Sequence, residues 1–441
     1  MIGELTKRAG RDEGAVRGCL NVLEKVFRHS SLLPFAVRLW DGSEWRNGEA
    51  KPTFTLEFKH PAALRKLFWG ANQVSMGEAY IYDDFDIKGD VEASFNLADF
   101  LLKGAKMGLK EKLQIVRQLL PLPIRNYSLA RQFSAQLKGT IHSRRRDAAA
   151  VQYHYNVSNE FYRLWLDPQM VYSCAFFHDP CEELEVAQQR KLDYICRKLR
   201  LKPGETLLDI GCGWGGLMLH AATNYGVEVT GVTLSEPQAD LANQRFRDAG
   251  VADRCRAEVM DYRDVCGSES FDKLVSVGMF EHVGEAQLPV YFQKAYSLLK
   301  PGGVFLNHGI TETWKRHGNN DESFVEKYVF PDGELLPIAT ILQIAAEAGF
   351  EVRDVESLRE HYALTLRRWV KRLEQNQEQA VQLTSPVTYR IWRIYMAGSA
   401  YGFTNGTLNL YQALLIKAGR RASGLPLTRC DWYRPCPSGY H

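Results

Sequence analysis

A glycine-rich turn at residues 207–216 carries the residues best suited to chemistry. Its first four residues form a short apolar run that is typical of a buried parallel strand, and a helix is expected from 217 to 224. Asp209 sets a carboxylate at the end of that strand, where open α/β sheets bind ligands. The glycines of the turn are Gly211, Gly213, Gly215 and Gly216. Because they lack a Cβ atom, the backbone can turn tightly and approach a ligand closely.

The residues after the next expected strand distinguish two classes of nucleoside cofactor. The glycines also fit the G-x-G-x-x-G pattern of dinucleotide sites, which require an acidic residue at the tip of the second strand. Here the strand expected at 227–233 ends in Thr233, followed by Leu234 and Ser235. Asp209, two residues before the first glycine, fits instead the D-x-G-x-G-x-G form of S-adenosylmethionine enzymes. We therefore expect S-adenosylmethionine as the cofactor.

Strands and helices alternate around this turn, which predicts an α/β domain. The expected strands are 206–210, 227–233, 256–260, 271–277 and 303–308, and the expected helices are 217–224, 237–249 and 288–299. This order is typical of a doubly wound, mostly parallel sheet with right-handed crossovers. Residues 311–348 and 359–416 are interpreted as aromatic-rich helical insertions that roof the site.

Residues 1–102 predict a smaller α+β domain. Its expected elements are a helix over 12–29, strands over 35–40 and 53–58 with Asp41-Gly42 as the turn between them, a helix over 61–69, and a last helix up to Leu102, capped at or near Asp90. The stretch 76–82 is interpreted as structural packing rather than as a site.

Residues 103–150 are predicted to form a basic linker. Between Lys103 and Arg146 there are eleven basic residues against one acid, Glu111. Apolar residues recur there at near-helical spacing. A basic amphipathic stretch predicts contact with an anionic membrane surface, where each Lys or Arg contributes about 1 kcal/mol. A solvated linker is the alternative, and nucleic acid is disfavoured because no recognised binding fold accompanies the charge.

Composition predicts a soluble globular protein with peripheral membrane contact at most. The 441 residues are 45% hydrophobic and 24% charged, and no apolar stretch approaches the roughly 20 residues of a spanning helix. Nine cysteines without a C-x-x-C pair indicate reduced thiols in the cytoplasm. Cys430 and Cys436 are interpreted as isolated thiols, and no metal site is expected.

Four separated motifs stand in order along the chain. They are Tyr172-Ser-Cys-Ala175, the turn from Asp209 to Gly216, Gly231-Val-Thr-Leu-Ser235 with Gln238, and Val277-Gly-Met-Phe-Glu-His-Val-Gly284. Together they resemble the cyclopropane-fatty-acyl-phospholipid synthases and the related mycolic acid methyltransferases. The resemblance covers roughly 153–415 and implies a catalytic domain over 151–441 with a seven-stranded sheet. One departure is Asn156, where aspartate is usual in the family.

The resemblance also implies how the cofactor is held. Asp209 and the backbone of Gly211, Gly213 and Gly215 are expected to hold the methionine part. The remaining expected contacts are Thr233, Ser235 and Gln238 near the ribose, Asp261 and Tyr262 near the adenine, and Tyr172 and Ser173.

A second set of residues is implied to bind bicarbonate, the base of the synthase family. The matching positions are Cys174, Glu281, His308, Ile310 and Tyr362. Glu281 is expected to accept the hydroxyl proton of the anion, while His308, Tyr362 and backbone amides hold it. Cys174 is interpreted as a residue of this anion site rather than as a nucleophile.

Methyl transfer to an alkene leaves a carbocation, which needs an electron-rich wall without water. The candidate aromatics are Tyr172, Phe176, Phe177, Phe280, Trp314, Tyr362, Trp369, Tyr401 and Phe403. Most are expected to be core residues, with two or three acting on the cation.

We therefore expect an enzyme that forms a cyclopropane across the cis double bond of an unsaturated phospholipid acyl chain. A methyl-branched or methylene product, a small-molecule N-methyltransferase and a non-catalytic lipid-binding protein are the alternatives. The resemblance further implies a homodimer, and the basic segment predicts peripheral association with the inner face of the membrane.

Overall fold

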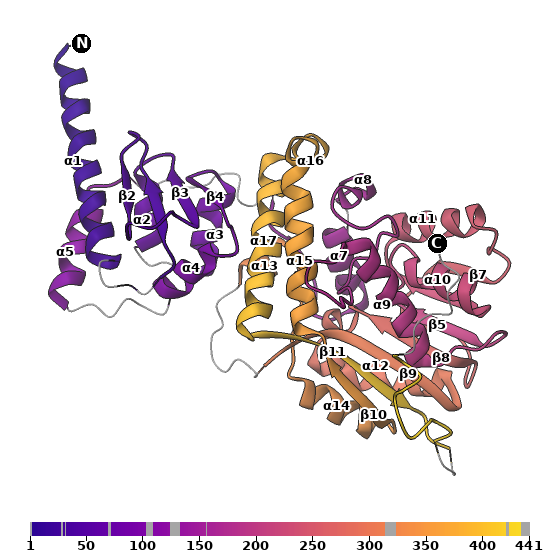
Figure 1. Ribbon diagram of the computed structural model, residues 1–441. Coiled ribbons are helices and arrows are strands. Elements are labelled where there is room, and N and C mark those ends of the chain that lie inside the picture. The colour runs from indigo at the N-terminus through magenta and orange to yellow at the C-terminus, as the bar shows by residue number, and fades with distance from the viewer. Residues whose placement is uncertain are drawn as a thin grey trace. The chain divides into compact units, whose positions relative to one another are not determined.

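The computed structural model describes residues 2–27, 30, 32–68, 72–102, 109–123, 133–155, 157–313, 323–419 and 423–433. The chain divides into two compact units (Figure 1). The first contains residues 1–136, 320–329 and 384–401, and the second contains 137–319, 330–383 and 402–441. Among the described helices, none combines the length and apolarity needed to cross a membrane.

The second unit is built on a seven-stranded sheet with the order β10-β11-β9-β8-β5-β6-β7. The strands are β5 Thr206–Ile210, β6 Glu228–Thr233, β7 Cys255–Val259, β8 Phe271–Val277, β9 Leu299–Glu312, β10 Glu351–Ser357 and β11 Leu408–Ile416. Strands β7, β6, β5, β8 and β9 run parallel, whereas β11 is antiparallel to both of its neighbours. The expected doubly wound, mostly parallel α/β fold is confirmed.

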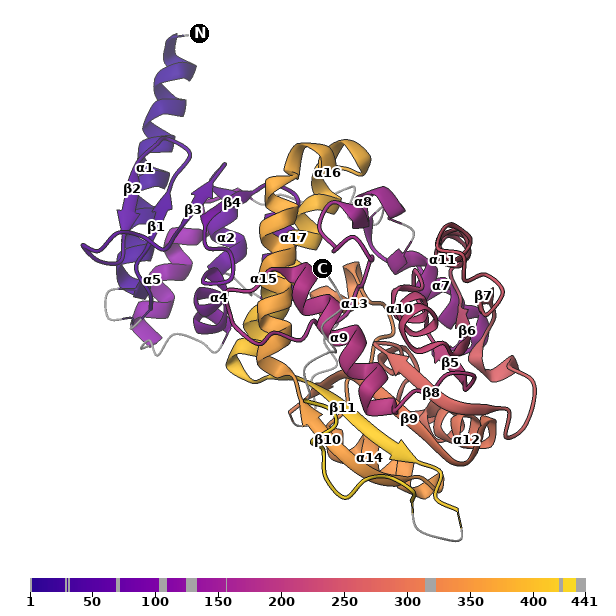
Figure 2. The ribbon, with the colours of Figure 1, turned by 45° about the vertical axis from the view of Figure 1, so that its right-hand side comes forward.

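Helices cover both faces of this sheet (Figure 2). One face packs against α9 Leu184–Leu199, α10 Gly216–Tyr225 and α11 Glu236–Asp248, and the other packs against α12 Leu288–Leu298 and α14 Ile338–Glu347. Adjacent residues of β5 alternate between the two cores, since Leu207 enters the first and Leu208 the second. The remaining helices of this unit include α7 Arg144–Tyr155, α8 Asn159–Arg163, α15 Arg359–Gln375 and α16 Gln377–Leu383.

The antiparallel strand corrects the sequence analysis. The family resemblance implies an antiparallel final strand, expected near Leu425 or over 352–358, but that strand is β11, within the region 359–416 that was interpreted as helical. Residues 352–358 do contribute a strand, β10, which runs in the direction of β9 because both pair antiparallel with β11. The helices α15 and α17 (Pro386–Asn405) precede β11, so the change of pattern at Leu408 was overlooked.

The first unit has a four-stranded sheet of order β2-β1-β3-β4. Its elements are α1 Ile2–Phe27, β1 Phe35–Arg38, β2 Glu44–Arg46, β3 Phe54–Phe58, α2 Ala62–Phe68, α3 Gln73–Ile81, β4 Phe85–Gly89, α4 Ser94–Leu102, α5 Leu109–Leu119 and α13 Phe324–Tyr328. The turn at Asp41-Gly42 leads into β2, not into β3, and β1 pairs with β3 in parallel. The expected connection was wrong because a three-residue edge strand leaves little periodicity to detect.

The basic segment is partly neutralised in the structure. Arg144 pairs with Asp264 at 2.7 Å, and Arg146 binds the Asp332 carboxylate through two nitrogens, at 2.6 and 2.8 Å. Helix α5 packs against α1 and buries Ile115 and Leu119, while Leu113 and Leu120 stay about half exposed, at 53% and 54%. Lys103, Lys106, Arg125 and Arg131 lie outside the described residues.

Candidate active site

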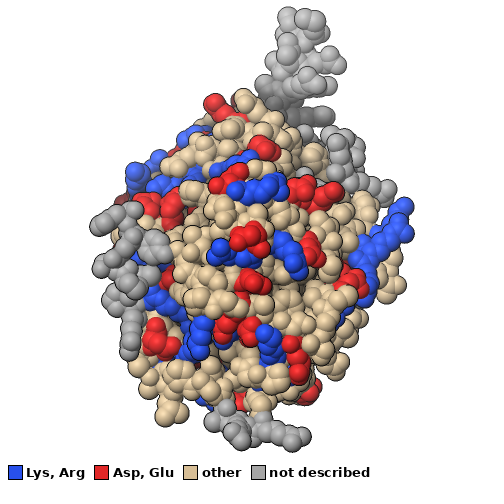
Figure 3. Space-filling model, turned by 90° about the vertical axis from the view of Figure 1, so that its right-hand side faces the viewer, with Lys and Arg blue, Asp and Glu red and all other residues tan. Residues whose placement is uncertain are grey.

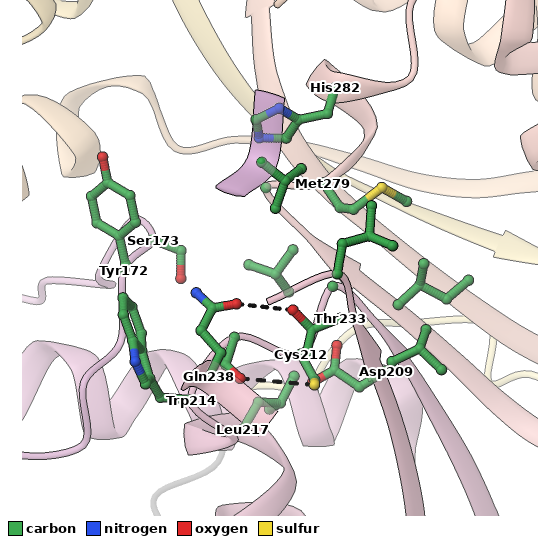
Figure 4. A pocket seen from close by; sticks show the side chains of 18 of the residues that line it. Tyr172, Ser173, Asp209, Cys212, Trp214, Leu217, Thr233, Gln238, Met279 and His282 are labelled. Carbon is green, nitrogen blue, oxygen red and sulfur yellow. Dashed lines mark hydrogen bonds between the residues drawn. The ribbon is translucent and has the colours of Figure 1, made fainter. Parts of the chain in front are cut away.

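A cavity lies at the carboxyl ends of β5, β6 and β8 (Figure 4). Nine of the expected cofactor residues line it: Tyr172, Ser173, Asp209, Gly211, Gly213, Thr233, Gln238, Asp261 and Tyr262. Gly213 has a φ of +53°. A Cβ atom there would meet no atom within 4 Å and would therefore occupy open space at the cavity, which glycine leaves free. The cavity therefore has the backbone cradle that the glycine pattern predicts.

Gly215 and Ser235 lie outside the cavity lining. Gly215 is the N-cap residue of α10 with a φ of +75°, and a Cβ atom there would lie 2.6 Å from the ring of Phe246. Ser235 is buried at the start of α11, where its backbone N–H donates to Thr233 Oγ1 at 3.2 Å. In the structure both residues shape the turns that carry the lining residues.

Asp209 is buried beside a cation that the sequence analysis overlooked. Burial raises the pKa of its carboxyl group to about 7, and the charge of Lys191 opposes that rise. Lys191, on α9, is 2% exposed and donates from Nζ to Ser173 Oγ at 2.8 Å. Burial lowers the pKa of the Lys191 ammonium to about 8. The signal that could have identified it is a lysine on the apolar face of an amphipathic helix.

Gln188, one turn before Lys191 on α9, holds the segment that covers the cavity. Its Nε2 donates to the carbonyl oxygens of Val171, at 3.2 Å, and Ser173, at 2.9 Å. Between them, the ring of Tyr172 packs against Trp165 and Trp369, with centroid distances of 5.4 and 5.3 Å. The segment is therefore fixed by a buried amide on one side and an aromatic cluster on the other.

The polar groups near the expected ribose and adenine positions are already paired. Thr233 Oγ1 donates to Gln238 Oε1 at 2.9 Å (Figure 4), which leaves the Gln238 amide nitrogen for a ligand. Asp261 binds Arg263 through two bonds of 2.6 and 2.8 Å, and Arg263 also lines the cavity. Arg263 therefore compensates the charge of the Asp261 carboxylate at the cavity.

The expected anion site is not part of the cavity lining, although it adjoins it in sequence. Ile310 N–H donates to Glu281 Oε1 at 2.6 Å, while Glu281 Oε2 is buried without a hydrogen-bond partner among the described residues. Burial raises the pKa of Glu281 to about 7, and the Ile310 N–H opposes that rise. His308, two residues before Ile310 on β9, accepts at Nδ1 from Gln412 Nε2 at 3.1 Å.

Cys174 and Tyr362 converge on one backbone carbonyl. The Cys174 thiol lies 3.8 Å from the oxygen of Leu358, which also accepts from Tyr362 N–H at 3.1 Å. Cys174 is fully buried, and burial raises the pKa of its thiol, so it stays protonated. A protonated, inaccessible thiol is a poor nucleophile. Within the described residues, no cluster of His, Cys, Asp and Glu is suited to hold a metal ion.

The candidate aromatics occupy different surroundings. Tyr362 packs on Phe403 at 4.8 Å between centroids and on Trp369 at 6.0 Å, so three of them form one wall with Tyr172. Phe280 packs against the backbone of β9 at Gly309. Phe176 stacks on Tyr194, Phe177 lies under the Arg368 guanidinium, and Tyr401 belongs to the first unit, where it bonds Asp99. Trp314, like Asn156 and Cys436, lies outside the described residues.

Comparison with known proteins places the chain in a family. The model described as mycolic acid cyclopropane synthetase matches residues 142–413, and one described as a domain of unknown function (DUF7884) matches residues 22–99. A probable fatty acid methyltransferase of Pseudomonas putida is 41% identical over 408 residues, which covers 91% of this chain and 97% of that protein.

Two further relatives match a smaller share of the chain. The cyclopropane-fatty-acyl-phospholipid synthase of Escherichia coli K12 is 38% identical over 274 residues, 62% of this chain and 69% of that protein. The crystal structure of mycolic acid cyclopropane synthase CmaA1 with SAH and CTAB superposes with a TM-score of 0.58 at 36% identity, covering 61% of this chain and 97% of that one. The chain belongs to the mycolic acid cyclopropane synthetase family and is an S-adenosylmethionine-dependent methyltransferase.

Proposed function

We propose that this methyltransferase forms a cyclopropane across the cis double bond of an unsaturated phospholipid acyl chain, with bicarbonate as the base. The observation that carries the proposal is the buried carboxylate of Glu281, which has one oxygen held by Ile310 N–H and one without a partner among the described residues. A methyltransferase acting on oxygen or nitrogen would need a base at its nucleophile. The name of the Escherichia coli relative supports the lipid substrate and the ring product.

The cavity residues fit S-adenosylmethionine, which supplies an electrophilic methyl group when bound. Asp209 offers a carboxylate to the ammonium of the methionine part, and Lys191 with Ser173 offers donors to its carboxylate. Gly213 allows the backbone to approach, and the amide nitrogen of Gln238 can donate to a ribose hydroxyl. Tyr172 lines the cavity and packs against Trp369, and these rings are suited to exclude water and stabilise a cation.

Ring closure needs a proton to leave the methylated chain, and the buried set fits an anion that takes it. Glu281 Oε2 can accept a hydrogen bond from the hydroxyl group of bicarbonate. This bond would offset the free energy that a buried oxygen without a partner costs. Tyr362 and His308 are the expected donors to the anion. Cys174 closes the site with an un-ionised thiol.

A methyl-branched or methylene product is the second candidate. The Pseudomonas putida relative, which matches 91% of this chain, is named a probable fatty acid methyltransferase. Such a product would come from the same substrate and cavity, because only the fate of the cation differs.

The test is gas chromatography with mass spectrometry of fatty acids from unsaturated phospholipid vesicles after incubation with protein and S-adenosylmethionine, with and without bicarbonate. We expect a product one CH₂ heavier, identified as the ring against a standard, with a yield that depends on bicarbonate. The same assay is run on Glu281→Gln. Its matched control is Glu258→Gln, which changes a carboxylate paired with Arg256 on β7. A branched or methylene product would favour the second candidate, and unchanged lipid would refute both.

Membrane association at the inner face and a homodimer complete the proposal. The exposed Leu113 on the basic helix α5 and Leu120, directly after that helix, support peripheral binding. The face of the molecule in Figure 3, in contrast, intersperses acidic and basic side chains. Replacing both leucines by glutamine should reduce sedimentation with anionic vesicles, and light scattering after size exclusion should give twice the chain mass. Unchanged sedimentation, or a monomer, would contradict the respective part.

A further inference from the structure

A row of polar side chains crosses the sheet beside the expected anion site. Glu356 of β10 lies directly opposite Gln412 of β11, and Gln412 lies directly opposite His308 of β9. Residues paired in this way across strands share a face of the sheet. Gln412 and His308 are each only 1% exposed. Helix α9, which covers this face, places Lys198 over the row, also 1% exposed.

Polar contacts link these four residues into a chain that ends at His308. Lys198 Nζ contacts the carboxylate of Glu356 and donates to Gln412 Oε1 at 2.8 Å. Gln412 Nε2 in turn lies 3.1 Å from His308 Nδ1. Tyr194 supports the far end, since its hydroxyl donates to Glu356 at 2.9 Å.

The lysine determines which way the amide faces. A lysine ammonium has donors only, so the Gln412 atom facing Lys198 must be the carbonyl oxygen. The amide nitrogen then faces His308, and because it donates, Nδ1 must accept through its lone pair. Burial holds the pKa of His308 well below its usual value, and the positive charges of Lys191 and Lys198 add to this effect. A neutral imidazole with a lone pair on Nδ1 carries its proton on Nε2.

We propose that Lys198 and Gln412 are positioning residues that fix the tautomer of His308 and thereby make its Nε2 a hydrogen-bond donor. His308 Nε2 is buried and has no partner among the described residues. An N–H at this atom attracts an anionic oxygen, whereas a lone pair would repel it. The part of the inference that concerns anion binding rests on the proposed bicarbonate function.

The tautomer can be measured without turnover, by long-range ¹H–¹⁵N NMR of protein labelled with [¹⁵N]histidine. We expect the His308 signals, assigned by their loss in His308→Gln, to show a protonated Nε2 and an unprotonated Nδ1. In Gln412→Met, which keeps the size and removes the donor, Nδ1 should shift toward the protonated value. Tyr194→Phe, which removes one bond to Glu356 but keeps Lys198 and Gln412, should leave both shifts unchanged. A proton on Nδ1 in the unsubstituted protein would overturn the inference.

Kinetics then test the consequence for the anion. Gln412→Met should raise the KM for bicarbonate about 10- to 100-fold, the loss seen when a ligand's orienting partner is removed from metal sites. The KM for S-adenosylmethionine should stay within about twofold, because Gln412 does not line the cofactor cavity. An unchanged KM for bicarbonate would refute the role in anion binding. Absence of lipid product from the unsubstituted protein would refute the proposed function and leave the NMR result standing.

Discussion

The cofactor cavity and the expected anion site differ in whether their polar groups have hydrogen-bond partners. The anion set consists of Cys174, Glu281, His308, Ile310 and Tyr362. In the cavity, Thr233 is bonded to Gln238, and Asp261 to Arg263. In the anion set, Glu281 Oε2 and His308 Nε2 are buried without partners among the described residues. An unpaired buried polar atom costs stability until a partner satisfies it, and here two such atoms belong to residues that the family resemblance assigns to the anion. The cavity is therefore pre-organised by pairs within the protein, whereas the proposed anion site leaves two buried polar atoms for an occupant to bind.

Loss of the Glu281 carboxylate should have the largest effect. Glu281→Gln keeps an oxygen to accept from Ile310 N–H but cannot take up a proton. We expect ring formation to fall about 100- to 1000-fold, within the range for general acid–base catalysis, because the bicarbonate base loses the carboxylate that accepts its hydroxyl proton. Initial rates by mass spectrometry measure this, and calorimetric titration with S-adenosylhomocysteine should show unchanged binding. Equal loss of cofactor binding would mean that the two sites are not separate.

The same variant should also change the pH dependence of stability. Burial raises the pKa of Glu281 to about 7 from 4.5. Because the folded value is the higher one, stabilisation is complete below the unfolded pKa and is lost as the pH rises through about 7. Between about pH 5 and about pH 8, the unsubstituted protein should lose about 2–3 kcal/mol more unfolding free energy than Glu281→Gln. Urea titrations at both pH values test this, and parallel curves would contradict it.

Loss of Lys191 should weaken cofactor binding. Lys191→Met removes the donor to Ser173 and the cation near Asp209. We expect the Kd for S-adenosylhomocysteine to rise about 10- to 100-fold, equivalent to about 1.4–2.7 kcal/mol. Lys202→Met, at an exposed position just beyond α9, is the control and should bind normally. Equal Kd values for the two variants would exclude Lys191 from cofactor binding.

Two glycines allow the smallest test of the cavity. Gly213 and Gly250 both have positive φ, +53° and +67°, and open space where a Cβ would lie. Alanine at either position should cost about 1 kcal/mol of stability, because L-residues disfavour this conformation. Gly213→Ala should also weaken S-adenosylhomocysteine binding, since only Gly213 lines the cavity. Equal affinities would argue against a backbone cradle at Gly213.

The cofactor cavity could be predicted from sequence because local pattern builds it. The strands expected at 206–210 and 271–277 match β5 and β8 residue for residue. The glycine turn and Thr233 lie at strand ends, and parallel strand ends meet at one edge of a sheet. Nine expected residues therefore reach the same cavity.

What the sequence could not show depends on distant partners. Lys191 and Lys198 lie seven residues apart on α9 and look like solvated charges until the sheet beneath them is known. Gln412 is significant only because β11 pairs with β9, and β11 was interpreted as helix. Helical periodicity can place a lysine on the apolar face of α9, but it cannot show which distant partners compensate the buried charge. The roles assigned to Glu281 and His308 came from the family resemblance.

The central claim is that bicarbonate, bound by the buried Glu281 carboxylate, takes the proton whose loss closes the ring. The direct measurement is the initial rate of cyclopropane formation on unsaturated phospholipid vesicles as bicarbonate is titrated into bicarbonate-free buffer. We predict a rate that rises and saturates with bicarbonate in the unsubstituted protein and stays near zero throughout in Glu281→Gln. A rate that is independent of bicarbonate, or a Glu281→Gln rate equal to that of the unsubstituted protein, would contradict the account.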